Sequence, residues 1–211
     1  SIRRQRQMCI RDRNIADVDV SSHRQAEAAA DPRFMMRWSP RAMTGEPITQ
    51  EDMSVLVEAA RWAPSCFNLQ PWRFVFSLRK DQYWDKYLGL LMDMNRVWAD
   101  KAGALVVLLS DDQFMSSNEP SPTSGFDAGS AWMSMALQAQ SMGLVTHAMW
   151  GVEHERAPQV LNLGERFKLQ AMVAVGRPGE KEDLPQPLQE REAPSPRKSI
   201  SELAFSGRLP G

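Results

Sequence analysis

An uninterrupted apolar run, Ala-Leu-Val-Val-Leu-Leu at residues 104–109, constrains this chain more than any other feature of its 211 residues. The run has the length of a strand, and neither it nor any other stretch approaches the ~18 apolar residues of a membrane span. A strand without polar positions suits the centre of a sheet that is buried on both faces. We therefore expect residues 104–110 to form a central strand of a globular protein that does not enter a membrane.

The rest of the chain mixes helical and extended patterns. Thr49 and Asp52 have the spacing of a capping box, so a helix is expected from there to about residue 62. Further helices are expected over 20–36, 81–102, 126–142, 154–163 and 199–205, and further strands over 72–78, 144–149 and 169–175. Because these strands and helices do not alternate regularly, the pattern favours an α+β fold.

The helix expected over 126–142 is rich in small residues on several of its faces. Small residues all round are typical of close packing at a helix–helix or subunit interface. The residues concerned are Ala128, Gly129, Ser130, Ala131, Ser134, Ala136, Ala139 and Ser141.

Composition excludes several classes of function. The net charge is −1, and it becomes −5 without residues 1–13, which hold five arginines and one aspartate, so a nucleic-acid partner is not expected. Two cysteines make no disulfide framework, and the three histidines include no pair at metal-ligand spacing, so no metal site is expected. We recognise no signal-peptide core and expect a cytoplasmic protein.

Residues 1–13 are interpreted as lying outside the folded domain. Residues 7–12 resemble translated sequencing-adaptor sequence, and the alternative is a disordered basic tail. Residues 14–211 are expected to form a single domain.

Two short clusters have the residue types of a ligand site. Arg37, Ser39 and Arg41 combine two guanidiniums with a hydroxyl, a set that suits a phosphate, although arginines in a loop are more often simply solvated. Residues 64–72 follow a helix with hydroxyl, amide and aromatic side chains that suit a polar, planar ligand. The alternative for this second cluster is a connection whose polar groups satisfy its own backbone.

Taken together, these motifs resemble the FMN-dependent nitroreductase family. The pattern is R-x-S-x-R at 37–41, followed after about two dozen residues by A-P-S-x-x-N-x-Q-P-W-x-F at 63–74. Further similar segments are Asn95 before the apolar strand, F-D-A-G at 126–129, A-M-W-G at 148–151 and R-K-S-I-S-E at 197–202. The similarity spans about residues 37–205, and its order makes it specific.

The resemblance implies a nitroreductase-like fold, with a central mixed sheet flanked by helices, in an intertwined homodimer. It implies that Arg37, Ser39, Arg41 and Arg197 hold the FMN phosphate and ribityl chain. It also implies that Pro64, Ser65, Cys66 and Asn68 reach the flavin from the partner subunit, and that Gln70 lies close to the ring system. Asn95 would bond the pyrimidine edge, and the backbone around Trp150 and Gly151 would lie near flavin N5.

Three residues depart from the family pattern or stay open in role. Trp98 stands where many bacterial relatives place a lysine, so another donor to the pyrimidine or a lower flavin potential is implied. Cys66, at a position where serine or alanine is common, is interpreted as a packed side chain, the alternative being a redox-active thiol. His147 is a candidate proton donor, but a structural role is the preferred interpretation.

The function implied by the resemblance is an FMN-dependent NAD(P)H oxidoreductase. NADH or NADPH would reduce the flavin, and a small-molecule acceptor such as a nitroaromatic or quinone would reoxidise it in a ping-pong cycle. Water can supply the protons, so no catalytic side chain is assigned. The alternatives are a specialised member, such as a reductive dehalogenase or a dehydrogenase of one metabolite, or a flavin-binding module without turnover.

Overall fold

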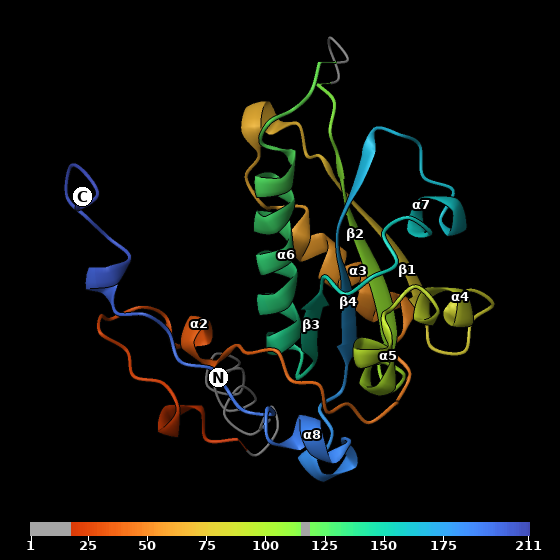
Figure 1. Ribbon diagram of the computed structural model, residues 1–211, viewed down its shortest axis with the longest axis horizontal. Coiled ribbons are helices and arrows are strands. Elements are labelled where there is room, and N and C mark those ends of the chain that lie inside the picture. The colour runs from red at the N-terminus through yellow and green to blue at the C-terminus, as the bar shows by residue number, and fades with distance from the viewer. Residues whose placement is uncertain (1–17, 115–118) are drawn as a thin grey trace, which may run out of the picture.

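A computed structural model describes residues 18–114 and 119–211, so the tail at residues 1–13 lies outside the described residues (Figure 1). Four strands form one sheet in the order β1-β2-β4-β3. Their bounds are Trp72–Leu78 for β1, Ala104–Asp111 for β2, Val145–Met149 for β3 and Phe167–Gly176 for β4. The α+β prediction is confirmed.

The pairing of the described strands is antiparallel throughout, whereas a mixed sheet was predicted. The reason lies in the position of β4. The helix between β2 and β3 returns the chain so that these two strands run in the same direction. Because β4 lies between them and runs against both, the two parallel strands never become neighbours.

Strand β2 is the predicted central strand, and every one of its residues is buried. Side chains of a strand point alternately to the two faces of the sheet. Leu105, Val107 and Leu109 accordingly join one core cluster. Their neighbours Ala104, Val106 and Leu108 join the other. The apolar run thus anchors two cores, one on each face of the sheet.

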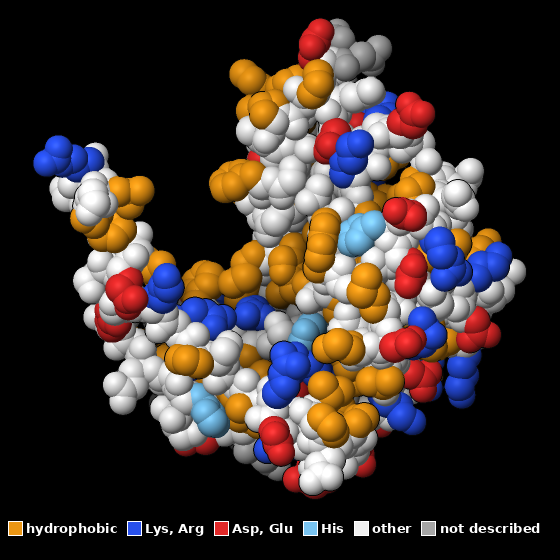
Figure 2. Space-filling view, viewed as in Figure 1, with side chains coloured by type: hydrophobic (Ala, Val, Ile, Leu, Met, Phe, Trp, Pro, Cys, Tyr) orange, Lys and Arg blue, Asp and Glu red, His pale blue; other side chains and the backbone are white. Residues whose placement is uncertain are grey.

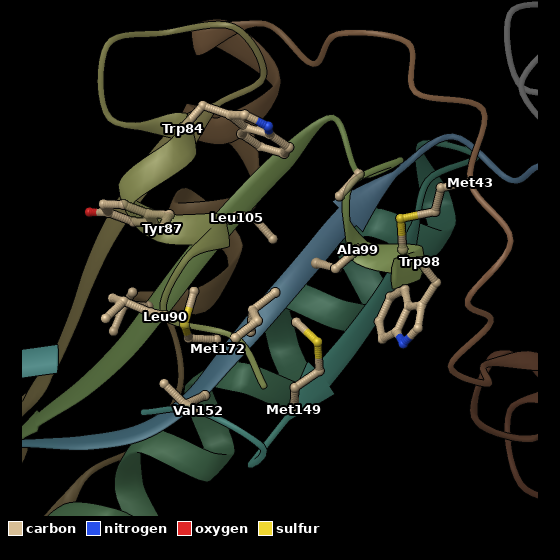
Figure 3. Packing of buried hydrophobic residues seen from close by; sticks show 14 of the residues in the cluster. Met43, Trp84, Tyr87, Leu90, Trp98, Ala99, Leu105, Met149, Val152 and Met172 are labelled. Atoms are coloured by element: carbon tan, nitrogen blue, oxygen red, sulfur yellow. The ribbon is translucent and has the colours of Figure 1, made fainter. Parts of the chain in front are cut away.

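Different helices cover the two faces. Helices α3 (Gln50–Ala60) and α6 (Ser124–Ser141) pack on the face of Val106. Helices α4 (Trp84–Leu88) and α5 (Asp93–Ala99) pack on the face of Leu105, where the large side chains of this second core meet (Figures 1 and 3). Among the described residues, no helix is both long enough and apolar enough to cross a membrane.

The capping box at the start of α3 is confirmed. The Thr49 hydroxyl accepts a hydrogen bond from the Asp52 amide at 3.0 Å, and the Asp52 carboxylate accepts one from the Thr49 amide at 3.1 Å. Two orphan amides of the first helical turn are thereby satisfied. The helix continues to Ala60, close to the predicted end.

Several predicted helices are shorter than expected. The segment 20–36 contains only η1 (Val20–Ser22) and α2 (Pro32–Met36), because a residue before proline, here Asp31, disfavours the helical conformation. The segment 81–102 is divided into α4 and α5, because Leu91 leaves the helical path to pair with Val152. The remaining short helices are η2 (Cys66–Asn68), α7 (Ala157–Val160), η3 (Lys181–Asp183), α8 (Gln186–Gln189) and η4 (Ile200–Glu202).

Helix α6 buries only part of its small residues within this chain. Ala128, Ala131 and Ala139 are buried in the core on the sheet, and Ala136 is buried in a small cleft that Trp38 also lines. Gly129 is exposed, and a Cβ atom built there would meet nothing within 4 Å. Packing within the chain therefore explains the buried alanines and leaves the surface at Gly129 open.

One close contact in the fold requires a glycine. A Cβ atom at Gly103 would lie 2.6 Å from the carbonyl oxygen of Glu46 and 2.6 Å from Cγ1 of Ile48. Gly103 itself is tied to its neighbours, since its amide donates to Val175 and its carbonyl accepts from Arg79. The backbone has no room to move away from an added methyl group.

We therefore expect Gly103→Ala to lower the free energy of unfolding by about 1–3 kcal/mol, the usual cost of overpacking. Gly164→Ala is the matched control, because nothing lies within 4 Å of a Cβ atom there. Urea denaturation of both variants measures the effect. Equal stability of the two would contradict the close approach at Gly103.

Candidate functional site

Residues 37–42 alternate between two environments. The odd-numbered residues of this segment are partly exposed, and the even-numbered residues are buried. Successive side chains of an extended chain point to opposite sides, which explains the alternation. The R-x-S-x-R pattern therefore presents its three polar side chains, Arg37, Ser39 and Arg41, on one side. We call residues 37–42 the anion segment.

Arg37 belongs to a cluster of three guanidiniums. Burial and the charge of Arg197 lower the pKa of Arg37. Burial, together with the charges of Arg197 and Arg37, lowers the pKa of Arg24. Arg24 also ties three segments together, because it donates to the carbonyls of Met35, Arg37 and Ser195 at 2.6–2.9 Å. Arg197 was predicted for this position, whereas Arg24 was not.

The charges of this cluster are not balanced within the described chain. Among residues 18–114 and 119–211, the carboxylate ion pairs involve other arginines and none of these three. Figure 2 shows Lys and Arg side chains on the floor of a hollow between the C-terminal arm and the body of the molecule. Neighbouring guanidiniums that have no carboxylate partner form a site for an anion.

Arg41 has a different environment from the other three. Its Nη1 lies 3.6 Å from Oε2 of Glu192, a residue that is only 5% exposed. Oε1 of Glu192 accepts hydrogen bonds from the amides of Arg41 and Ala42 at 2.6 and 2.8 Å. Arg41 therefore reaches the anion segment already paired with a carboxylate.

Asn95, Trp150 and Gly151 lie together. The Asn95 amide donates to the Gly151 carbonyl at 3.2 Å. A Cβ atom at Gly151 would lie 2.6 Å from the Asn95 side chain, so this contact needs glycine. The Trp150 side chain is 67% exposed, and its ring lies 4.2 Å from that of His154. We call these residues the ring corner: it offers the side-chain amide of Asn95 and the exposed ring of Trp150 to a ligand.

The loop at 64–70 stores backbone strain. Phe67, Asn68 and Gln70 have positive φ angles of 49°, 55° and 49°, which residues other than glycine rarely adopt. Hydrogen bonds hold the loop in place, since Ser65 Oγ accepts from the Gln70 amide at 2.9 Å. Strain of this kind costs about 1–3 kcal/mol per residue and concentrates at functional sites.

The loop itself is well exposed. Phe67 is 87% exposed, Pro64, Asn68 and Gln70 are exposed, and Cys66 is a free, half-buried thiol. The strained loop thus holds an aromatic ring and several polar groups away from its own chain.

This loop lies far from the anion segment within one chain. The Cys66 amide donates to Asp127 at the start of α6. Residues 36–38 instead line a small cleft with Gln140, near the end of the same helix. Thirteen residues of α-helix separate these two points by about 20 Å. One chain therefore does not bring the predicted site residues together in a single place.

Comparison with known proteins identifies the family. The model of the nitroreductase family matches residues 34–97. A solved structure described as an oxidoreductase containing FMN is 42% identical, with 89% of this chain and 96% of that chain covered and a TM-score of 0.87. This chain belongs to the nitroreductase family. The family's members are oxidoreductases, and the predicted nitroreductase-like fold is confirmed.

Two further relatives are more distant. The NADH dehydrogenase of Thermus thermophilus is 26% identical over 69% of this chain and 85% of its own length. A nitroreductase family protein of Streptococcus pneumoniae is 20% identical, with 81% of this chain and 96% of that chain covered and a TM-score of 0.64. At that identity the second relative shows the fold alone.

The family resemblance leaves the role of each individual site residue a prediction, and two residues were missed. Arg24 and Glu192 lie in polar stretches that carry no motif, and each reaches the site only through the tertiary fold. Trp98, which stands in place of the family's lysine, is 1% exposed and packs 4.7 Å from the His147 ring. It therefore belongs to the core and not to the surface of the site.

His147 lies under the anion segment. Its Nδ1 is 3.3 Å from the Pro40 carbonyl, and because a carbonyl only accepts, this nitrogen carries the proton. Burial, followed by the charges of Arg41 and Arg37, lowers the pKa of His147 to about 4. The ring is thus neutral at physiological pH, which favours the structural role over proton donation.

A pH dependence of stability follows from this lowered pKa. Between about pH 6.5 and pH 4 the unfolded chain takes up a proton at His147 that the native protein excludes. The contribution of the neutral ring is complete above pH 6.5 and is lost as the pH falls towards 4. It amounts to at most about 3 kcal/mol, since one pKa unit is worth about 1.4 kcal/mol.

We expect the free energy of unfolding to fall less steeply over this range in His147→Phe than in the native chain. Urea titrations at several pH values and one protein concentration measure the difference. His23→Phe, at an exposed position, is the control. Identical slopes for His147→Phe and the native chain would show that His147 is not buried in its neutral form.

Proposed function

We propose that this protein binds FMN and uses NADH or NADPH to reduce small acceptors such as nitroaromatics or quinones. The observation that carries the proposal is the uncompensated cluster of Arg24, Arg37 and Arg197 in a member of this family. The similar solved oxidoreductase contains FMN, whose phosphate is an anion of the kind that this cluster fits. When bound, FMN supplies the hydride chemistry between the nicotinamide and the acceptor.

The residues of the anion segment would hold the phosphate. Arg37 and Arg197 supply bidentate donors, Ser39 supplies a hydroxyl whose oxygen already accepts from Arg37 at 3.2 Å, and Arg41 stands at the edge beside Glu192. A planar guanidinium fork matches phosphate oxygens better than an ammonium does. Arg24 adds a positive charge from behind.

The corner of Asn95 and Gly151 would meet the ring system. Asn95 offers an amide to a polar ring edge, and the absence of a side chain at Gly151 lets its backbone approach a planar ligand closely. The exposed Trp150 ring would border the place where a nicotinamide or an acceptor stacks. No side chain is needed here as an acid or base, because solvent reaches this open corner.

A homodimer would complete the site. The strained loop and the anion segment lie about 20 Å apart along α6 in one chain. A second copy related by a two-fold axis across α6 would bring the loop of one chain to the anion segment of the other. Pro64, Ser65, Cys66, Asn68 and Gln70 would then act on the partner's FMN. The open face of α6 at Gly129 supports this arrangement.

The proposal is tested by reconstitution with FMN. We expect a yellow protein whose flavin absorbance bleaches with NADH or NADPH under anaerobic conditions and returns when a quinone is added. Bleaching without recovery would indicate a flavin-binding module without turnover. Failure to bind FMN at micromolar concentration would overturn the proposed function.

Arg37→Ala tests the phosphate site directly. Loss of a charge-assisted hydrogen bond should weaken FMN binding by about 1.5–3 kcal/mol and leave riboflavin binding nearly unchanged, because riboflavin has no phosphate. Fluorescence titration measures both affinities. Arg33→Ala is the control, since Arg33 is exposed and paired with Asp31. Equal weakening of both ligands would assign Arg37 a purely structural role.

Gly129→Gln tests the dimer. In an isolated chain, replacing a glycine inside a helix stabilises that helix by up to about 1 kcal/mol. In the proposed dimer the added side chain would separate the two α6 helices, so sedimentation should shift towards the monomer and FMN should be lost. Ser54→Gln on the exposed face of α3 is the control. An unchanged dimer that still binds FMN would place the interface elsewhere.

A further inference from the structure

The anion segment is held in place mainly by side chains. Its residues belong to no strand. The Ala42 carbonyl at its end accepts from the Gly179 amide at 3.0 Å, and Met43 bridges to Pro178. An extended segment outside a sheet has backbone groups that need other partners. Two titratable side chains from distant parts of the sequence supply partners for the Pro40 carbonyl and for the amides of Arg41 and Ala42, and neither was assigned this role by the motifs.

Glu192 holds the segment from one side. It lies three residues after the end of α8 and about 150 residues from Arg41 in the sequence. One of its oxygens accepts from two consecutive amides, those of Arg41 and Ala42, and the other lies 3.6 Å from the Arg41 guanidinium. A carboxylate oxygen can accept from both amides at once, and it accepts more strongly than a neutral hydroxyl oxygen would.

His147 holds the segment from the sheet. It belongs to β3, 107 residues from Pro40, and it donates from Nδ1 to the Pro40 carbonyl at 3.3 Å. Trp98 packs against its ring at 4.7 Å and limits its rotation. One side chain therefore bonds the carbonyl just before Arg41, and the other bonds the amides at and just after it.

We propose that Glu192 and His147 are positioning residues that preorganise the anion segment for the phosphate. The inference rests on the proposed binding of FMN. Holding Arg41 and its backbone in one geometry before the ligand arrives removes part of the ordering cost of binding. The hydrogen bonds of Glu192 and His147 order the anion segment, so the benefit is expected for the phosphate and not for the ring system.

The charge of Glu192 acts in the opposite direction to its hydrogen bonds. A carboxylate beside Arg41 weakens the attraction of that arginine for an anion, whereas its bonds to the amides preserve the geometry. Glu192→Gln and Glu192→Ala both remove the charge, but only glutamine keeps a side-chain oxygen that accepts from the amides. The difference between these two variants therefore isolates the positioning role.

The experiment measures the dissociation constants of riboflavin and FMN for the full chain. The Kd of riboflavin divided by the Kd of FMN gives the contribution of the phosphate. We expect this ratio to be about tenfold smaller in Glu192→Ala than in Glu192→Gln, the scale of two lost hydrogen bonds. Glu190→Gln, at a nearby exposed glutamate, should match the native chain. Equal ratios in the alanine and glutamine variants would overturn the inference.

His147→Phe provides a second test that does not depend on the folding of Glu192→Ala. Phenylalanine keeps the packing on Trp98 but has no donor for Pro40, so the ratio should fall about three- to tenfold with riboflavin affinity unchanged. A fall in both affinities by one factor would show a structural role only and would overturn the inference. A native ratio near one would instead refute the phosphate site itself, and with it the proposed function.

Discussion

The burial of β2 on both faces is the constraint on which the rest of the structure depends. A strand whose alternate residues enter two cores has to be covered twice, and α3 with α6 and α4 with α5 supply the two layers. It also needs a strand on each side, and β1 and β4 supply them. Strand β3 is left at the edge of the sheet. The candidate site lies beside this edge, where His147 of β3 bonds the Pro40 carbonyl.

The edge strand brings together parts of the site that are distant in sequence. His147 in β3 bonds the anion segment, and the chain that leaves β3 continues directly into Trp150 and Gly151. Leu91 pairs with Val152, so the break between α4 and α5 carries Asn95 to the same corner. The break in the predicted helix therefore forms the ring corner of the site. In a continuous helix, the Leu91 backbone would be bonded within the helix and could not pair with Val152.

Local signals predicted the fold well, and tertiary contacts explain what was missed. The central strand, the capping box at Thr49 and the long helix α6 depend on patterns within a few residues, and all are confirmed. The division of helices and the antiparallel position of β4 depend on partners that are far away in the sequence. The same holds for the site, where a motif marks Arg37 and Arg41 but nothing marks Arg24 or Glu192.

The charges show why the site needs the contacts that the motifs omit. Four arginines converge on one region, and Glu192 compensates Arg41 alone. If every guanidinium had a carboxylate, an anion would have to displace protein groups in order to bind. If none had, Arg41 would add a fourth unpaired charge to those of Arg24, Arg37 and Arg197, and the amides of Arg41 and Ala42 would lose their partner. One carboxylate, bonded to the backbone from behind, stabilises the segment and leaves three positive charges for the ligand.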